Sequence, residues 1–295
     1  MESRPLHIPA YAKINLSLEV IGRRDDGYHD VVTILQTVNL ADTLTLSVAD
    51  ELVVTCDDPE LQGQDNIVWT AATRLAERAG ISPHARIHVS KRIPVAAGLG
   101  GGSADAASAL LGLNRLWGLG LAVSNLVSIA AELGSDVPFL ITGGTALGAG
   151  RGDEITVLPD LPSIDVLVVA PSETIPAKTP SLYRALTPVD FSDGRHTKRL
   201  TEGLTTHPLT TNFCRNTFER PARAIFPGLA DVWDRVAAAA QHPPRLSGAG
   251  PALFCLPSSE NERTRVAAAL QGTGATAYLV RTLSPAADAG IDPTV

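Results

Sequence analysis

The sequence predicts an α+β protein built from two domains, and three observations support that expectation. The chain has 295 residues, of which 44% are hydrophobic and 19% are charged, so it is long and apolar enough to fold around more than one small core. Strand patterns come first in its first half, and helix patterns follow. A proline-bounded break at 159–162 then precedes a new apolar run. We therefore expect an N-terminal domain over 1–160, a C-terminal domain over 161–284 and a loose tail over 285–295.

Alternation of apolar with polar or small residues predicts the strands of the first half. Residues 12–20 alternate in this way, and residues 43–48 repeat the pattern with threonine and serine between the apolar residues. Further strands are expected over 31–38, 52–56 and 85–93. These segments should be half-buried strands of a sheet with one face in the core.

Apolar residues at helical spacing predict three helices in the same half. The first spans 66–79 and stops at Gly80, because glycine tolerates the left-handed backbone that ends many helices. The second covers about 103–116, directly after a cluster of glycines. The third begins after Ser124, a good N-cap, and ends at Gly134.

The second half reads as another mixture of strands and helices. Strands are expected over 164–170, 252–257 and 275–282, and helices over 216–240 and 260–270. Pro227 should interrupt the first of these helices, since proline breaks a helix interior. Residues 187–215 read as a polar connecting segment.

Composition excludes several classes of function. The formal net charge is −7, and this acidic balance disfavours a nucleic-acid-binding protein, which displaces counterions with positive charge. No stretch reaches the roughly 18 uninterrupted apolar residues of a membrane span. Residues 1–21 lack the charged-then-apolar order of a signal segment. We therefore expect a cytoplasmic protein that does not bind a membrane.

Three cysteines, Cys56, Cys214 and Cys255, lie far apart in the chain. None belongs to a C-x-x-C pair, so the sequence suggests neither a disulfide framework nor a zinc site. We expect each to pack as a small hydrophobic residue.

A glycine-rich segment between a predicted strand and a predicted helix is the sharpest feature of the chain. It comprises Pro94, Val95, Ala96, Ala97, Gly98, Leu99, Gly100, Gly101, Gly102, Ser103 and Ala104. Glycines let several backbone N–H groups converge, and the start of a helix adds unpaired N–H groups and the positive end of its dipole. We therefore expect phosphate here, with the Ser103 hydroxyl on a phosphate oxygen or in a magnesium shell. A positive φ at Gly101 should exclude β-branched residues there.

This segment matches neither of two common phosphate motifs. No Gly-Lys-Ser/Thr closes it as in a Walker loop, and Ser103 stands where the third glycine of a dinucleotide fingerprint would lie. An ordinary surface turn is the alternative, which the strand-loop-helix context disfavours.

Three segments together carry a family resemblance. They are the glycine segment 94–107, the segment 10–16 (Ala-Tyr-Ala-Lys-Ile-Asn-Leu) and the segment 247–254 (Ser-Gly-Ala-Gly-Pro-Ala-Leu-Phe). In this order they resemble the phosphate loop, the N-terminal motif and the C-terminal glycine motif of the GHMP kinases (galactokinase, homoserine kinase, mevalonate kinase, phosphomevalonate kinase and relatives). The resemblance implies the two-domain GHMP kinase fold, with the ATP and substrate site in the cleft between the domains. It also implies ATP and Mg²⁺ as cofactors.

Four local features narrow this resemblance. They are Lys13-Ile14-Asn15-Leu16, Asp26-Gly27-Tyr28-His29, the loop 98–105 and the segment 133–139. Jointly they resemble the GHMP kinases of the non-mevalonate isoprenoid route, whose acceptor is a cytidine diphosphate conjugate of methylerythritol. The chain departs from the usual pattern at Ala96 and Ala97, where many members carry glycine, and at Ala249, where serine or threonine is common.

The resemblance implies catalytic roles for Lys13 and Asp136. Asp136 would accept the proton of the attacking hydroxyl, and Lys13 would stabilise the negative charge that develops. The residue patterns alone leave two other interpretations open, a strand lysine that faces solvent and an aspartate that caps a helix or a turn.

The other expected site residues divide into two groups. Nucleotide contacts are expected from Asn66, Lys91 and the loop 94–104, although Asn66 also suits a helix N-cap and Lys91 a solvated strand end. The substrate residues that the resemblance implies are Asn15, Tyr28, His29, Tyr183, Gly248 and Gly250. The two tyrosines would hold the cytosine between them, and His29 would pair with its polar edge.

Three alternative functions remain open. Another GHMP small-molecule kinase, of the homoserine or mevalonate type, is disfavoured by Gly27-Tyr28-His29, and a non-catalytic nucleotide-sensing protein is disfavoured by intact Lys13 and Asp136. An RNA-binding module is disfavoured by the net charge. We therefore expect a small-molecule substrate bound by a monomer or a homodimer, and we assign no residue as a metal ligand.

Overall fold

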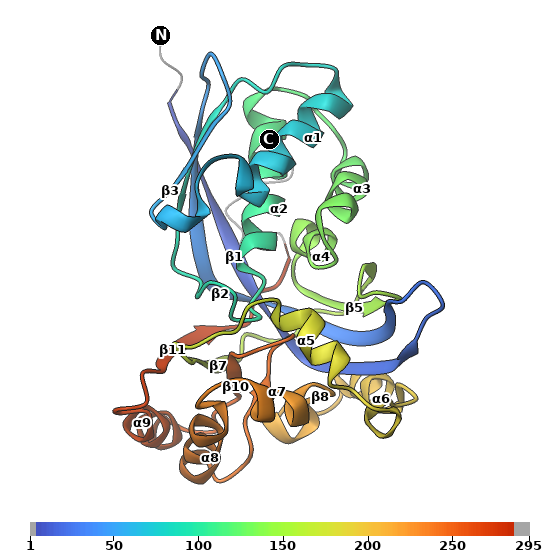
Figure 1. Ribbon diagram of the computed structural model, residues 1–295, viewed down its shortest axis with the longest axis vertical. Coiled ribbons are helices and arrows are strands. Elements are labelled where there is room, and N and C mark those ends of the chain that lie inside the picture. The colour runs from blue at the N-terminus through green and yellow to red at the C-terminus, as the bar shows by residue number, and fades with distance from the viewer. Residues whose placement is uncertain (1–3, 286–295) are drawn as a thin grey trace.

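The computed structural model describes residues 4–285. The predicted tail therefore lies outside the described residues, apart from Pro285. Two sheets, each flanked by helices, make up the fold (Figure 1). The α+β class that the sequence predicts is confirmed.

The larger sheet is built around two long antiparallel strands. Its strands are β1 (Leu6–Arg23), β2 (His29–Ser47), β3 (Val53–Cys56), β4 (Arg86–Ser90), β5 (Thr145–Ala149), β6 (Glu154–Val157) and β8 (Arg215–Asn216). The order is β3-β4-β2-β1-β8, and β5 pairs with β2 and with β6. Sequence analysis did not anticipate β5, β6 or β8.

Strand β2 corrects the prediction of two separate strands over 31–38 and 43–48, because the chain stays extended between them. Asp42 interrupts the apolar pattern, yet its carboxylate is fully buried. It accepts hydrogen bonds from the backbone N–H groups of Arg92 (2.5 Å) and Ile93 (2.8 Å). Partners distant in sequence thus satisfy a polar residue that locally signals a turn.

The register between β1 and β2 shifts on both sides of one short stretch. One shift lies between Tyr11 and Lys13, and another between Asn15 and Ser17. Such bulges bend a strand and re-aim its side chains, and they occur often beside functional sites. Residues 13–15 therefore lie in a stretch where the pairing of β1 with β2 is irregular.

Helices cover one side of the larger sheet (Figure 1). They are α1 (Ile67–Ala79), α2 (Gly101–Leu116), α3 (Val123–Leu133) and the unpredicted α4 (Val137–Thr142). Asn66 caps α1 by accepting the N–H of Val68 at 2.9 Å, and Gly80 ends it with φ 66°, as expected. The expectation that Ser124 caps α3 is wrong, because the helix starts at Val123 with Ala122 as its N-cap.

The smaller sheet comes from the second half of the chain. Its order is β11-β7-β10-β9, with β7 (Asp165–Ala170), β9 (Arg245–Leu246), β10 (Leu253–Cys255) and β11 (Thr276–Arg281). The helices of this half are α5 (Lys178–Arg184), α6 (Arg195–Gly203), α7 (Glu219–Ile225), α8 (Leu229–Ala240) and α9 (Glu260–Ala269). The gap between α7 and α8 contains Pro227, as predicted.

Helix α6 corrects the prediction that residues 187–215 are a polar connection. The helix is mostly polar and contains a single large apolar residue, Leu200, so no recurrence of apolar residues predicts it. It is anchored instead through Thr197, whose N–H donates to Glu19 (2.6 Å) and whose hydroxyl lies 2.6 Å from that of Ser17. Buried polar contacts with β1 therefore hold this helix in place.

Two hydrophobic cores share the long β1–β2 ladder. Leu16 and Ile34 belong to one core, which also takes in Val168 and Phe254 of the smaller sheet. Leu18, Val20 and Val31 belong to the other core, together with α7 and α8. The two sheets are thus packed through the same pair of strands, and the division at residue 160 stays a prediction.

The three cysteines are buried and free, as predicted. Within the described range, no helix has both the length and the apolar character needed to cross a membrane.

Candidate active site

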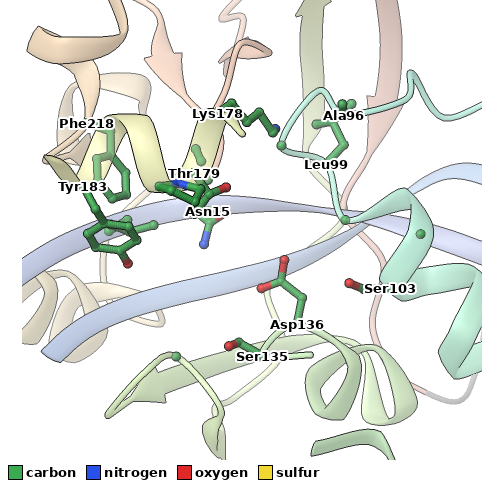
Figure 2. Close-up of a pocket in the computed structure, with 18 of the residues that line it drawn as sticks. Asn15, Ala96, Leu99, Ser103, Ser135, Asp136, Lys178, Thr179, Tyr183 and Phe218 are labelled. Carbon is green, nitrogen blue, oxygen red and sulfur yellow. The ribbon is translucent and has the colours of Figure 1, made fainter. Parts of the chain in front are cut away.

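One large cavity brings the three sequence motifs together. Its volume is about 1290 Å³, and Figure 2 shows part of its lining. From the predicted site it takes Lys13, Asn15, Tyr28, His29, Asn66, Lys91, Pro94, Val95, Ala96, Ala97, Gly98, Leu99, Gly100, Gly101, Gly102, Ser103, Asp136, Tyr183 and Gly248. Ala104 and Gly250 are absent from the lining residues. Residues from β1, the glycine loop, the start of α4 and the C-terminal half therefore face one space.

Backbone hydrogen bonds join the glycine loop to both other motifs. The N–H of Lys13 donates to the carbonyl of Leu99 (2.9 Å), and the N–H of Ala252 donates to the carbonyl of Ala97 (2.9 Å). The Ser247 hydroxyl donates to the carbonyl of Gly98 (3.0 Å). These contacts fix the path of the loop between β1 and the turn around 247–250.

Glycine is required at specific points of the loop. Gly98 has φ +88°, and a Cβ there would lie 2.3 Å from the carbonyl oxygen of Ser247. Gly100 has φ +74° and caps α2. The expectation of a positive φ at Gly101 is wrong, because Gly101 is already the first residue of α2. A side chain at Gly101 would instead crowd Ile93, whose Cγ2 lies 3.2 Å from the Cβ position.

Ala96 is one of the departures from the usual family pattern, and it has a measurable consequence. Its φ is +54°, in the left-handed region that favours glycine. An L-residue pays about 1–2 kcal/mol for this conformation. The loop therefore carries backbone strain at Ala96, where the family resemblance leads us to expect glycine.

Lys13 and Asp136 form an ion pair inside the cavity. The Lys13 side chain is buried, and its Nζ lies 2.7 Å from Asn15 Oδ1 and 3.2 Å from Asp136 Oδ2. Asn15 is held in turn, because its amide donates to the Thr33 hydroxyl at 2.8 Å. A solvent-facing Lys13 is thus the wrong interpretation.

Asp136 occupies the N-cap position of α4, yet its side chain makes no capping hydrogen bond. Its carboxylate instead pairs with the Lys13 ammonium and points into the cavity (Figure 2). The capping interpretation therefore does not account for this residue, and an acceptor oxygen is left facing the space that a substrate would occupy.

Aromatic rings line the cavity on the side of α5. The His29 ring stacks on Tyr183 with centroids 4.6 Å apart and planes at 25°, and Tyr183 meets Phe218 edge-on at 4.8 Å. Burial, together with the charge of Arg23, lowers the pKa of His29. Burial also raises the pKa of Tyr183 to about 12. The pair is therefore neutral at pH 7, with one imidazole donor and one acceptor.

The rings of Tyr28 and Tyr183 do not lie opposite each other with room for a base between them. Its ring is exposed, and the guanidinium of Arg151 lies 5.2 Å from the ring centroid. The face of Tyr183 is already covered by His29. A cytosine held between the two tyrosines stays a prediction, and it requires the rings to rearrange.

Lys91 and Asn66 line the cavity but have structural partners as well. The Lys91 ammonium lies 2.5 Å from Asp42 and 2.7 Å from Asp105. Burial raises the pKa of Asp105 to about 7 despite the opposing charge of Lys91. The side-chain oxygen of Asn66 accepts the N–H of Val68 in α1, and its side-chain nitrogen donates to the carbonyl of Leu61. Nucleotide contacts from either residue remain predictions.

Ala104 and Gly250 are placed differently from the rest. Ala104 is buried in the core on α2 and borders a separate cavity. The carbonyl of Gly250 accepts a hydrogen bond from Lys178. The neighbouring Gly248 is supported by Asn216, whose amide donates to its carbonyl at 2.8 Å.

Sequence analysis missed several residues of the cavity, among them Ser135, Lys178, Thr179, Phe191 and Phe218. Lys178 and Thr179 belong to α5, which no apolar pattern signals. The signal available for Lys178 was compositional, because the chain contains only four lysines.

Comparisons with known proteins show which family the chain resembles. The sequence profile of the GHMP kinases N terminal domain matches residues 66–144. The 4-diphosphocytidyl-2-C-methyl-D-erythritol kinase of Dehalococcoides mccartyi is 40% identical over 281 residues, which are 95% of this chain and 99% of that protein.

Solved structures give the same result. A crystal structure of 4-(cytidine 5'-diphospho)-2C-methyl-D-erythritol kinase superposes with a TM-score of 0.79 and 35% identity, covering 95% of this chain and all of that one. Homoserine kinase from Cytophaga hutchinsonii covers 96% of each chain with a TM-score of 0.72, but at 19% identity it shares only the fold. The chain therefore belongs to the 4-diphosphocytidyl-2-C-methyl-D-erythritol kinase family of the GHMP kinases.

Proposed function

We propose that this kinase transfers the γ-phosphate of ATP to the 2-hydroxyl of 4-diphosphocytidyl-2-C-methyl-D-erythritol, a step of the non-mevalonate route to isoprenoid precursors. One observation carries the proposal. The buried Lys13–Asp136 ion pair lies in a cavity bordered on one side by a glycine phosphate loop and on another by the His29–Tyr183 stack. Charge and anion-binding backbone are what phosphoryl transfer needs, and the aromatic surface suits an acceptor that carries a base.

The Lys13–Asp136 pair supplies the proton acceptor and the charge. Asp136 accepts the proton of the attacking hydroxyl as that oxygen bonds to phosphorus. Lys13 holds the Asp136 carboxylate in place and stabilises the negative charge on the transferred group. Asn15 fixes the direction of the Lys13 ammonium through its 2.7 Å contact.

The glycine loop and the first turn of α2 provide the nucleotide site. Helix α2 is 16 residues long and begins at the loop, so its free N–H groups and its dipole favour the phosphates. Ser103 lies in this first turn and lines the cavity. These features support ATP as the phosphate donor.

The residues present also fit Mg²⁺ bound mainly through the nucleotide. Ser103 and Asp136 offer hard oxygen donors on the same side of the cavity (Figure 2). Within residues 4–285 no group of three or more His, Cys, Asp or Glu side chains forms a metal site. Magnesium often keeps waters and substrate phosphates as ligands, so two protein oxygens suffice. When bound, the ion would neutralise charge on the phosphates.

The aromatic side of the cavity supports a base-bearing acceptor. The neutral His29 ring, stacked on Tyr183, offers a donor and an acceptor for the polar edge of cytosine. Stacking of a base on such rings contributes roughly 1–3 kcal/mol in nucleic-acid-binding proteins. A cytoplasmic location and a monomeric or homodimeric state complete the proposal.

The test measures ADP formation with a panel of alcohols: the cytidine conjugate, methylerythritol phosphate, homoserine and mevalonate. We expect turnover with the cytidine conjugate and much less with the others. The variant Asp136→Asn serves as the control for contaminating kinases. Preference for homoserine or mevalonate would contradict the acceptor, and ATP binding without turnover on any alcohol would favour a nucleotide sensor.

A further inference from the structure

Lysine is rare in this chain, and its distribution is uneven. Four of the 24 basic residues are lysines: Lys13, Lys91, Lys178 and Lys198. The first three line the large cavity, whereas Lys198 is exposed on α6. Two of the three cavity lysines face carboxylates, Lys13 at Asp136 and Lys91 at Asp42 and Asp105. The third, Lys178, has a different environment.

Lys178 is the first residue of α5, and its ammonium donates to the carbonyl of Gly250. Among the described residues, no carboxylate forms a salt bridge with it. Burial and the charge of Lys13 lower its pKa to about 8, and the charge of Asp136 opposes this with a smaller effect. Holding a half-buried ammonium without a carboxylate is unfavourable, which is typical of a binding site awaiting an anion.

The backbone beside Lys178 is strained as well. Ala177 precedes the helix with φ 48° and ψ 40°, a left-handed conformation that costs a non-glycine residue about 1–2 kcal/mol. This conformation starts α5 so that Lys178 turns toward the glycine loop. In Figure 2 the Lys178 side chain points toward the loop that carries Ala96 and Leu99, and all three residues line the cavity.

The partner of Lys178 lies directly against the phosphate loop. A Cβ on Gly98 would be 2.8 Å from the nitrogen and 3.0 Å from the oxygen of Gly250. On the same helix, Tyr183 stacks on His29 at the acceptor side. Lys178 therefore sits between the loop expected to hold the nucleotide and the rings expected to hold the acceptor.

We propose that Lys178 is a phosphate-binding residue of the transfer site, whose ammonium contacts an oxygen of a substrate phosphate between the glycine loop and α5. The phosphate belongs either to the nucleotide or to the diphosphate of the acceptor. This inference rests on the proposed function only for the identity of the acceptor. Binding of a nucleotide phosphate by Lys178 does not depend on that identity.

The test compares Lys178→Met and Lys178→Arg with the matched control Lys198→Met. Calorimetry with the non-hydrolysable analogue AMP-PNP and with cytidine diphosphate reports the two phosphate sources separately. We expect Lys178→Met to weaken one of them by about 10- to 100-fold, the range for losing a charge-assisted hydrogen bond. Lys178→Arg should recover most of that affinity, and Lys198→Met should bind both as the wild type does.

A pH series separates phosphate binding from a merely structural role. The ammonium is charged below its pKa of about 8 and neutral above it. The ligand measured is whichever of AMP-PNP and cytidine diphosphate binds more weakly to Lys178→Met. The affinity of the wild type for that ligand should therefore fall about 10-fold between pH 7 and 9, relative to the affinity of Lys178→Arg, which keeps its charge. Lys178→Met should show no such difference between the two pH values.

Two results would overturn the inference. One is unchanged affinity for both probes together with unchanged kcat in a folded Lys178→Met protein. The other is loss of affinity that Lys178→Arg does not restore and that has no pH component, which would mean that Lys178 only supports the turn at Gly250. If the wild type failed to phosphorylate the cytidine conjugate while AMP-PNP binding still required Lys178, the proposed function would fail and this inference would stand.

Discussion

The Lys13 ammonium lies 3.2 Å from the Asp136 carboxylate, although Lys13 belongs to β1 and Asp136 precedes α4. Two features of the fold produce this contact. The β1–β2 register shifts on either side of residues 13–15, and the Asp136 side chain leaves the start of α4 uncapped. Both local irregularities lie at the same ion pair, which supports the catalytic role proposed for it.

Replacing the proposed base should abolish most turnover without removing the nucleotide. In Asp136→Asn the side chain keeps its size but cannot accept the hydroxyl proton, so kcat should fall by about 10²–10⁴-fold. The affinity for AMP-PNP should stay within a few-fold of the wild type. Steady-state kinetics and calorimetry check both values, with Asp193→Asn as an exposed control. Near-normal kcat in Asp136→Asn would rule out the base assignment.

Gly98 should tolerate no side chain. Its φ is +88°, and an added Cβ would lie 2.3 Å from the carbonyl oxygen of Ser247. Because that oxygen belongs to the backbone, no side-chain movement can relieve the clash. We expect Gly98→Ala to lower the melting temperature by several degrees and to weaken AMP-PNP binding at least about 10-fold, because the loop must move. The matched variant is Gly102→Ala, whose Cβ has no neighbour nearer than 3.8 Å. Equal melting temperatures for the two variants would mean that the loop is less constrained than the geometry implies.

The regular elements and the glycine loop could be predicted because their signals are local. Asn66 and Gly80 mark the ends of α1 in the sequence itself, and the loop is set by glycines at 98 and 100. The pairing of Lys13 with Asp136 came from the family resemblance, since nothing in either segment points to the other.

The elements that escaped prediction are defined by tertiary partners. β2 continues through Asp42 because backbone N–H groups of residues 92 and 93 satisfy the carboxylate. Helix α6 depends on Thr197 and its contacts with β1. Lys178 lines the cavity at the start of α5, directly after Ala177 in a left-handed conformation, and an alanine gives no sequence signal of that conformation.

Asp105 should make stability depend on pH in a specific direction. Its pKa is about 7 in the folded protein against 3.8 for an ordinary aspartate, mainly because of burial. Its contribution to stability is therefore full below the unfolded pKa and is lost as the pH rises through about 7. Asp105→Asn removes this titration, so the variant should gain stability relative to the wild type between pH 5 and pH 8.

Urea unfolding at pH 5 and at pH 8 measures this difference. The free energy of unfolding of Asp105→Asn minus that of the wild type should be more positive at pH 8. Asp193→Asn, measured at the same two pH values, is the control for an Asp→Asn change at an exposed position. A constant difference for Asp105→Asn would mean that Lys91 keeps Asp105 ionised throughout this range.

The aromatic side of the cavity gives the last prediction, that the acceptor is read by its base as well as by its hydroxyl. His29 is neutral at pH 7 and lies stacked on Tyr183 at 4.6 Å, so its nitrogens can pair with cytosine while the rings provide an apolar wall. Removing the imidazole should cost roughly 1–3 kcal/mol of base recognition, equivalent to about 5- to 150-fold in kcat/KM. We therefore expect His29→Ala to lower kcat/KM for the cytidine conjugate by that factor but to leave the low value for free methylerythritol phosphate unchanged. His207→Ala, at an exposed position, should affect neither. Equal losses on both acceptors would assign His29 to packing against Tyr183, and equal wild-type values for the two acceptors would mean that the base is not recognised.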